Sequence, residues 1–200
     1  MNLQSVSIVL LALVLSACST VKVPEQPLTW FEPPELLEDE SRYISSVASA
    51  TIPMTPVELR EFLAGKNSLI KYMEPVGDIA PPVKRVPIEG VWPEQGARRS
   101  LVQQDGHQML ERSLRNELTD FRYQVFGLTS GASRGIDHIY ADWSLEAVEG
   151  GTLFVWTYRV APRYKIARPF VRRTLNNELQ PFMQRAVDRM AVAARTHVAQ

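Results

Sequence analysis

The side chains best suited to acid–base or metal chemistry are scattered along this 200-residue chain. The three histidines are His107 at a predicted turn, His138 at the start of a predicted strand and His197 near the end. No two of them stand at metal-ligand spacing with an acid. The sequence also lacks a G-x-S-x-G elbow, a Walker loop and a G-x-G-x-x-G motif. We therefore expect no metal and no cofactor and assign no catalytic residue; these residues favour a non-enzymatic role but leave enzyme activity open.

Arg99 and Glu111 are opposite charges that a hairpin could bring together. They flank Asp105-Gly106, a dipeptide typical of hairpin turns. A three-residue loop would place Arg99 opposite Glu111, whereas a two-residue loop would place it opposite Arg112. In the wall of a cavity the pair could orient the polar end of a ligand. On the surface it would add only about 0–1 kcal/mol of stability.

Aromatic side chains recur at alternate positions of three predicted strands, and alternate positions share one face of a strand. One face of the last strand carries Phe154, Trp156 and Tyr158, and the preceding strands contribute Trp143 and Tyr123. Such a set can fill a solid core. It can also line a pocket in which the tyrosine and tryptophan polar atoms need partners. The same residues serve both interpretations.

The elements that must position these residues follow a simple order. A strand over residues 43–52 precedes a helix over 55–65, where Thr55 and Glu58 form a capping box and Pro56 takes the first helical position. Residues 68–82 predict a second short helix and a proline-rich loop. Six strands follow, over residues 83–89, 96–103, 107–118, 121–127, 137–148 and 151–161. The turns between them are short, so neighbouring strands must be antiparallel.

A long helix is predicted over residues 164–198. Pro169 fits its first turn, whereas Pro181 lies inside it and should kink it. A curved antiparallel sheet with this helix lying across it would give an α+β fold and bury the helix's apolar side. That side is predicted from residues near helical spacing: Ile166, Phe170, Leu175, Leu179, Phe182, Ala186, Val187, Met190 and Ala194.

Three stretches carry a family resemblance: "GARRSLVQQDGHQMLERSL" (96–114), "DFRYQVFG" (120–127) and "GTLFVWTY" (151–158). Together with the terminal helix, they make residues 42–200 resemble the START-like or SRPBCC superfamily, especially its polyketide cyclase/dehydrase-like branch. The resemblance implies the helix-grip fold, with about seven strands wrapped around the long helix. It also implies a cavity for an apolar or amphipathic ligand, with candidate wall residues Arg99, Glu111, Tyr123, Trp143, Phe154, Trp156 and Tyr158.

Cys18 is the only cysteine of the chain and follows the apolar run 6–15. That run is too short to cross a bilayer, which needs about 20 residues, but it suits the core of a signal peptide. Leu15-Ser16-Ala17-Cys18 resembles the bacterial lipobox, although no Lys or Arg precedes the apolar run. The alternative is an uncleaved anchor or an ordinary secretory signal with an incidental cysteine.

The lipobox resemblance implies a signal peptide over residues 1–17 and a lipid on Cys18. An acylated thiol is unavailable for disulfides, metal binding or catalysis. Because Ser19 rather than Asp follows the cysteine, the resemblance implies the outer membrane of a Gram-negative envelope, facing the periplasm. A Gram-positive host stays open.

Residues 18–41 are predicted to form a tether rich in proline and acids. Fully extended, it would reach about 75 Å. Trp30-Phe31 does not suit a spacer, and we expect this pair to dock on the domain rather than touch the membrane. The formal charge is zero, so no nucleic-acid partner is expected. The C-terminal helix is basic, which indicates either a solvated face or contact with anionic lipid headgroups.

Three functions remain open from the sequence. The first is an envelope lipoprotein that binds a hydrophobic or amphipathic molecule, for example a lipid. The second is an enzyme of the polyketide cyclase/dehydrase type, for which Glu111, Asp142 and His138 are the ionisable candidates. The third is an interaction protein whose cavity has collapsed. Residues 129–135 could form a lid at the cavity mouth. Protein partners and oligomeric state are not predicted.

Overall fold

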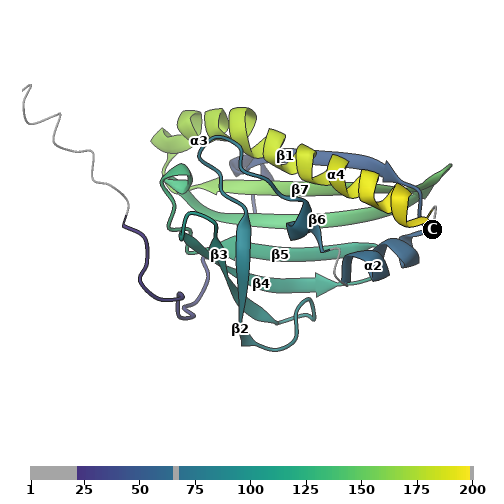
Figure 1. Ribbon diagram of the computed structural model, residues 1–200. Coiled ribbons are helices and arrows are strands. Elements are labelled where there is room, and N and C mark those ends of the chain that lie inside the picture. Colours follow the sequence, from purple (N-terminus) through teal and green to yellow (C-terminus); the bar gives the residue numbers. More distant parts are fainter. Residues whose placement is uncertain (1–21, 65–67, 199–200) are drawn as a thin grey trace, which may run out of the picture.

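The computed structural model describes residues 22–64 and 68–198. A curved seven-stranded antiparallel sheet forms its centre, with strand order β1-β7-β6-β5-β4-β3-β2 (Figure 1). The predicted fold is confirmed, and the strand bounds differ from the predicted ones by a few residues at most. The strands are β1 (Ile44–Ile52), β2 (Pro82–Glu89), β3 (Arg98–Gln103), β4 (Gln108–Asn116), β5 (Asp120–Phe126), β6 (Ile136–Val148) and β7 (Gly151–Pro162).

Tight turns explain the antiparallel order. The turn between β6 and β7 contains Gly150 and Gly151, both with positive φ (84° and 143°). A Cβ atom on Gly151 would lie 2.0 Å from the carbonyl oxygen of Ile52, so β1 approaches too closely for any other residue. From this turn onward, β7 pairs with β6 on one side and with β1 on the other.

The hairpin between β3 and β4 has the three-residue loop. Gln103 N donates to His107 O over 2.7 Å, which closes the loop over residues 104–106. Gly106 has φ 84°, a conformation that favours glycine. The register consequently pairs Arg99 with Glu111 and not with Arg112.

The predicted capping box is present at the start of α2 (Pro56–Ala64). Thr55 N donates to Glu58 Oε2 over 2.7 Å, and Glu58 N donates to Thr55 Oγ1 over 3.3 Å. The hydrogen bonds that the Thr55 backbone N–H and hydroxyl group donate to Glu58 Oε2 lower the pKa of that carboxyl group. The second short helix is a 3-10 turn, η3 (Leu69–Tyr72), and a loop over residues 73–81 leads from it to β2.

The C-terminal segment is helical almost throughout and lies across one face of the sheet (Figure 1). It consists of η5 (Lys165–Ala167, 3-10), α3 (Arg168–Thr174), η6 (Leu175–Leu179, π) and α4 (Gln180–Val198). The disturbance predicted at Pro181 takes the form of the preceding π turn, η6. Since proline has no N–H to donate, a wider turn rearranges the hydrogen bonds there.

The predicted buried stripe is correct from Leu175 onward and wrong at its start. Leu175, Phe182, Met190 and the other later members are buried. Ile166 and Phe170, by contrast, are 82% and 72% exposed. Ile166 lies in the 3-10 turn η5, before the α-helix begins, and Val171, four positions before Leu175, faces the core in place of Phe170.

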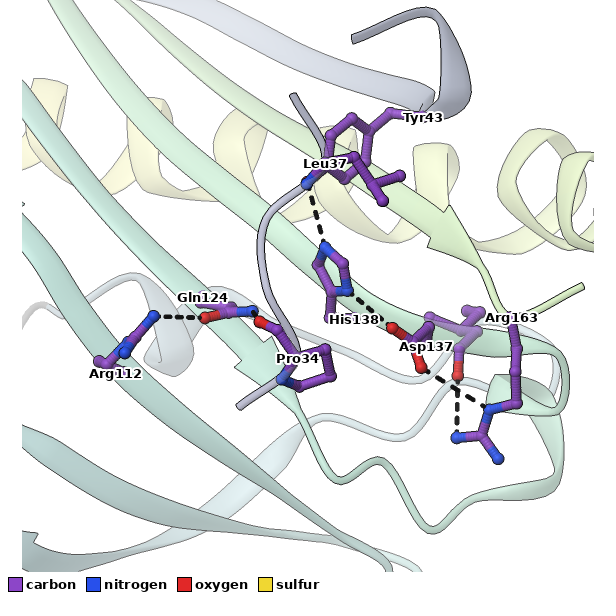
Figure 2. Close-up of polar contacts among 9 residues, drawn as sticks. Pro34, Leu37, Tyr43, Arg112, Gln124, Asp137, His138 and Arg163 are labelled. Carbon is purple, nitrogen blue, oxygen red and sulfur yellow. Dashed lines mark hydrogen bonds and ion pairs between the residues drawn. The ribbon is translucent and has the colours of Figure 1, made fainter. Parts of the chain in front are cut away.

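Residues 22–42, which we call the strap, lie along the sheet face opposite α4. We expected a tether over residues 18–41. The described part of that segment is instead packed against the sheet. The predicted docking of Trp30-Phe31 is confirmed: both rings meet Phe126 edge-on, at centroid distances of 5.1 and 5.3 Å. Leu28 N donates to Gln108 Oε1, and Gln124 Nε2 donates to Pro34 O (Figure 2).

The predicted signal peptide and Cys18 lie outside the described residues. Among the helices that are described, none is both long enough and apolar enough to cross a membrane.

Candidate functional site

A cavity of about 500 Å³ lies between the concave face of the sheet and the helices. The sheet forms its floor, while α2, η3 and η6 close it from the other side. Its walls are mainly apolar, with Leu63, Leu69, Ile79, Leu101, Met109, Val125, Leu128, Ile139, Leu175, Leu179 and Phe182 among the lining residues. Polar side chains of the sheet line it on β3, β4, β5 and β7, and others enter from α2, β2 and the loops, among them Arg60, Glu61, Arg85, Ser130 and Ser133.

The structure places the seven candidate wall residues in two layers. The lining layer holds Arg99, Glu111, Tyr123, Trp143 and Tyr158. Phe154 and Trp156 are completely buried and lie behind that layer, in the core packed around the sheet. The aromatic set thus fills the core in part and lines the cavity in part.

Arg99 and Glu111 form an ion pair in the cavity wall. Arg99 Nε and Nη2 each lie 2.5 Å from Glu111 Oε2. The side chains are only 11% and 4% exposed. Because both guanidinium contacts go to one carboxylate oxygen, the other oxygen, Oε1, is left out of the pair.

Trp92 completes this cluster and was not predicted from the sequence. Its ring lies over Arg99, with the guanidinium carbon 3.7 Å from the ring centroid. Arg99 is therefore held between an aromatic face and a carboxylate, an arrangement that suits the flat guanidinium group. Trp92 stands in the loop between β2 and β3, where no strand periodicity marks a residue as inward-facing.

A second unpredicted lining residue is Arg60 of α2. Its guanidinium group lies 5.7 Å from the centroid of Phe121 and donates to Asn116 Oδ1. Burial lowers the pKa of Arg60. The sequence offered no signal for it, because an arginine on an amphipathic helix is usually a solvated residue.

Trp156, Tyr123 and Tyr158 form a hydrogen-bonded relay that ends at the cavity. Trp156 Nε1 donates to Tyr123 Oη over 3.1 Å, and Tyr123 Oη lies 3.3 Å from Tyr158 Oη. An indole N–H can only donate, so the Tyr123 oxygen accepts from Trp156, and the Tyr123 O–H donates a hydrogen bond to Tyr158 Oη. Tyr158 is then left with its O–H free to donate into the cavity.

The two phenols stay protonated over the physiological pH range. Desolvation raises the pKa of Tyr123 well above its usual value, with the neighbouring Tyr158 and Glu111 adding to the effect. Desolvation likewise raises the pKa of Tyr158, again reinforced by Glu111. Both groups are therefore neutral hydrogen-bonding groups at neutral pH.

Two loops line the end of the cavity that meets a second pocket, and we call this end the mouth. Ser130, Ala132 and Ser133 of the loop 129–135 line the cavity. Ile79 and Ala80 of the loop 73–81 line it as well. All but Ser133 also border an adjoining pocket of about 350 Å³.

The loop 73–81 is fastened to the C-terminal helix. Asp78 N donates to Glu178 Oε2 over 2.8 Å, and Arg189 forms an ion pair with Glu74. Glu178 belongs to the π turn η6, so this turn both lines the cavity and holds the loop over it.

Two of the three ionisable candidates for catalysis lie away from the cavity. Asp142 forms an ion pair with Arg159 and does not line the cavity. His138 is 1% exposed and lies under the strap, where its Nε2 meets Tyr43 Oη at 3.1 Å and its Nδ1 meets Asp137 Oδ2 at 3.0 Å (Figure 2). Only Glu111 of the three faces the cavity.

The histidines are far apart in the fold, as their sequence positions indicate. His107 contacts Thr129 at the β3–β4 end, and His197 packs on Phe62 near the end of α4. Within residues 22–64 and 68–198, no group of three or more His, Cys, Asp or Glu side chains could hold a metal ion.

Solved structures with this fold resemble the chain at low sequence identity. The Zhui aromatase/cyclase from Streptomyces sp. R1128 is 14% identical, with a TM-score of 0.57 over 78% of this chain and 96% of that one. The protein TTHA0849 from Thermus thermophilus is 15% identical, with a TM-score of 0.55 over 77% and 99%. Ara h 8.0201 is 13% identical, with a TM-score of 0.52 over 77% and 99%.

A comparison with curated proteins gave no match. The family model described as "Polyketide cyclase / dehydrase and lipid transport" matches residues 43–195, which is nearly the whole described domain without its strap. The match covers every strand, the cavity wall and most of the C-terminal helix. The chain therefore belongs to the polyketide cyclase/dehydrase and lipid transport family, within the START-like superfamily of helix-grip folds.

Proposed function

We propose that this chain is a membrane-anchored envelope lipoprotein that binds a hydrophobic or amphipathic molecule in its helix-grip cavity. The observation that carries the proposal is the cavity itself: about 500 Å³, mainly apolar, with a small polar cluster in its wall. Ligand sites of proteins have volumes of roughly 300–1,000 Å³ and this same composition. Family membership supports the proposal, because the family's description includes lipid transport.

The wall chemistry indicates the shape of the ligand. The apolar body of the ligand would contact residues such as Met109, Leu128 and Phe182. Binding would remove apolar surface of both ligand and wall from water, which is favourable. A polar end would lie near Tyr158 and the Arg99–Glu111 pair. The free hydroxyl proton of Tyr158 favours a ligand oxygen that accepts a hydrogen bond, such as a carbonyl or ester oxygen.

The envelope location rests on the lipobox-like residues and on a lipid attached to Cys18. A mature lipoprotein carries two or three acyl chains, which give stable attachment where a single chain gives only marginal binding. The proposed setting is the outer membrane, with the domain facing the periplasm. The strap would then follow the acylated cysteine directly.

Native mass spectrometry tests the binding function. The chain starting at Ser19 retains every described residue and would be purified without detergent, then extracted with organic solvent. A bound apolar molecule is expected, displaced by the cavity-filling variant Leu128→Trp. The matched control Val57→Trp adds the same group at a 49% exposed position of α2 and should leave the ligand bound. A ligand-free mass together with no uptake of added fatty acid would overturn the proposal.

A second candidate function is a cyclase-type enzyme acting in the same cavity. The observation that favours it is Glu111, a carboxylate in the wall with one oxygen outside its ion pair. Such a group could act as a general base. The test is turnover of a linear poly-β-ketone thioester: Glu111→Gln should abolish turnover while the ligand still binds. Unchanged turnover in that variant, or none in the wild type, removes this candidate.

A further inference from the structure

The start of the C-terminal helical segment, residues 163–173, forms a tip with exposed apolar side chains. Tyr164 is 64% exposed, Ile166 is 82% exposed and Phe170 is 72% exposed. Three large apolar side chains are thus exposed within seven positions of the chain. Exposed apolar patches mark surfaces that meet a partner or a membrane.

The tip is also strongly basic. It contains five bases and no acid: Arg163, Lys165, Arg168, Arg172 and Arg173. Arg168 donates to the backbone carbonyl groups of Ser41, Arg42 and Tyr43, which are neutral and leave its charge uncompensated.

Little of this charge is neutralised by acids. Arg163 lies 3.9 Å from Asp137, a loose pair on the surface. Within residues 22–64 and 68–198, the structure gives Lys165, Arg172 and Arg173 no ion pair. All three are exposed. Positive charge thus surrounds the exposed apolar groups.

The tip lies beside the cavity mouth. Arg163 N donates to Gly135 O over 2.7 Å, and a Cβ atom on Gly135 would lie 3.0 Å from the Cβ of Ala167. Gly135 ends the loop 129–135, whose residues line the cavity. Figure 1 shows α3 and this loop at the same end of the molecule.

The described chain also begins at this end. A Cβ atom on Gly106 would lie 2.9 Å from Val23, so the strap starts beside the β3–β4 turn. His107 of that turn contacts Thr129, the first residue of the loop at the mouth. Figure 1 shows the first described residues on the same side of the molecule as α3.

We propose that the tip is a docking surface for an anionic lipid bilayer. Tyr164, Ile166 and Phe170 enter the interface between headgroups and acyl chains, and the bases meet lipid phosphates. Charge complementarity selects this occupant, because a second copy of the chain would bring one basic tip against another. Docking here turns the cavity mouth towards the membrane, so an apolar ligand passes between bilayer and cavity with little exposure to water. The surface acts without a lipid on Cys18.

Vesicle co-sedimentation of the chain starting at Ser19 tests this surface. We expect binding to vesicles of phosphatidylglycerol and phosphatidylcholine, weakened by salt, and little binding to phosphatidylcholine alone. Ile166→Ser/Phe170→Ser should lower the partition coefficient about tenfold or more, since two apolar groups no longer leave water. Arg172→Glu/Arg173→Glu should lower it by at least about tenfold at low salt.

Matched controls lie further along the same helical segment. Val192→Ser removes an apolar group that is 56% exposed on α4, and Arg185→Glu/Arg195→Glu reverses two exposed bases there. These variants should bind as the wild type does. Equal losses in the tip and control variants, or no binding to anionic vesicles, would overturn the proposal. A concentration-dependent dimer abolished by the Ile166→Ser/Phe170→Ser change would do so as well.

Discussion

At the scale of single residues, the Arg99–Glu111 pair determines how much a substitution in the cavity wall lowers the stability of the fold. The pair is almost fully buried, so removing one partner leaves an uncompensated charge. Arg99→Met should lower the free energy of unfolding by about 3–5 kcal/mol, as measured by urea denaturation. Arg99→Met/Glu111→Leu should restore most of that loss, because both desolvation costs disappear together. A double variant as unstable as the single one would contradict the argument.

The buried phenols give the fold a dependence on alkaline pH. Burial raises the pKa of Tyr123 and Tyr158 above 10.0, the usual value, which they regain on unfolding. Above that pH the folded chain holds more protons than the unfolded chain, so the free energy of unfolding falls as pH rises. Below it, these two groups contribute no pH dependence. Urea midpoints of Tyr158→Phe should fall less steeply than those of the wild type above about pH 10.

Residue identity alone did not separate wall from core. Tyr158 and Trp156 stand two positions apart on the same face of β7, yet one lines the cavity and the other is completely buried. The difference depends on the packing of distant segments over the sheet, and no local pattern contains that information. Trp92 shows the same limit, since its position depends on how the loop after β2 folds back over Arg99.

At the scale of elements, local signals were most reliable where the chain itself supplies the partner. Thr55 and Glu58 satisfy each other's backbone groups, and Gly106 supplies the positive φ of its turn. Both features were predictable from a few neighbouring residues. The stripe on the C-terminal helix failed at Ile166, which lies in a 3-10 turn, and at Phe170, which stands five positions before Leu175 and so faces another side of the helix.

The capping box of α2 makes a prediction at this scale. Thr55→Ala removes the acceptor of Glu58 N and should cost about 1 kcal/mol of unfolding free energy. Thr55→Ser keeps the hydroxyl group and should remain close to the wild type. Urea denaturation of both variants measures the difference, and an equal loss in both would show that the methyl group of Thr55 matters instead.

The strap behaves as a structural element, although its regular structure is limited to the 3-10 turn η2 (Glu40–Arg42). Leu28 N and Leu37 N donate to Gln108 and Tyr43, so hydrogen exchange at these two amides should be slower than at strap amides that donate no hydrogen bond. Trp30→Ala removes an edge-on contact with Phe126 and should speed exchange at Leu28. If all strap amides exchange at one fast rate in the wild type, the strap does not dock in solution.

At the scale of the whole molecule, the strap changes the geometry of the proposed anchor. The acidic, proline-rich composition suggested a spacer, but its rings and backbone groups find partners on strands far away in the sequence. Only residues 19–21 separate Cys18 from Lys22, and four peptide steps span at most about 14 Å. A lipid on Cys18 would therefore hold the domain close to the bilayer. The basic tip and cavity mouth lie at the end where the chain enters.

The anchor itself is tested by Cys18→Ala in the full chain. Acylation requires the thiol, so the variant should lose incorporation of labelled palmitate and leave the membrane fraction after a high-salt wash. The salt wash matters because it removes any attachment through the basic tip, whose electrostatic part is screened. Thr20→Ala is the matched control and should stay acylated and membrane-bound. A Cys18→Ala chain that withstands the wash would instead point to the apolar run 6–15 as an uncleaved anchor.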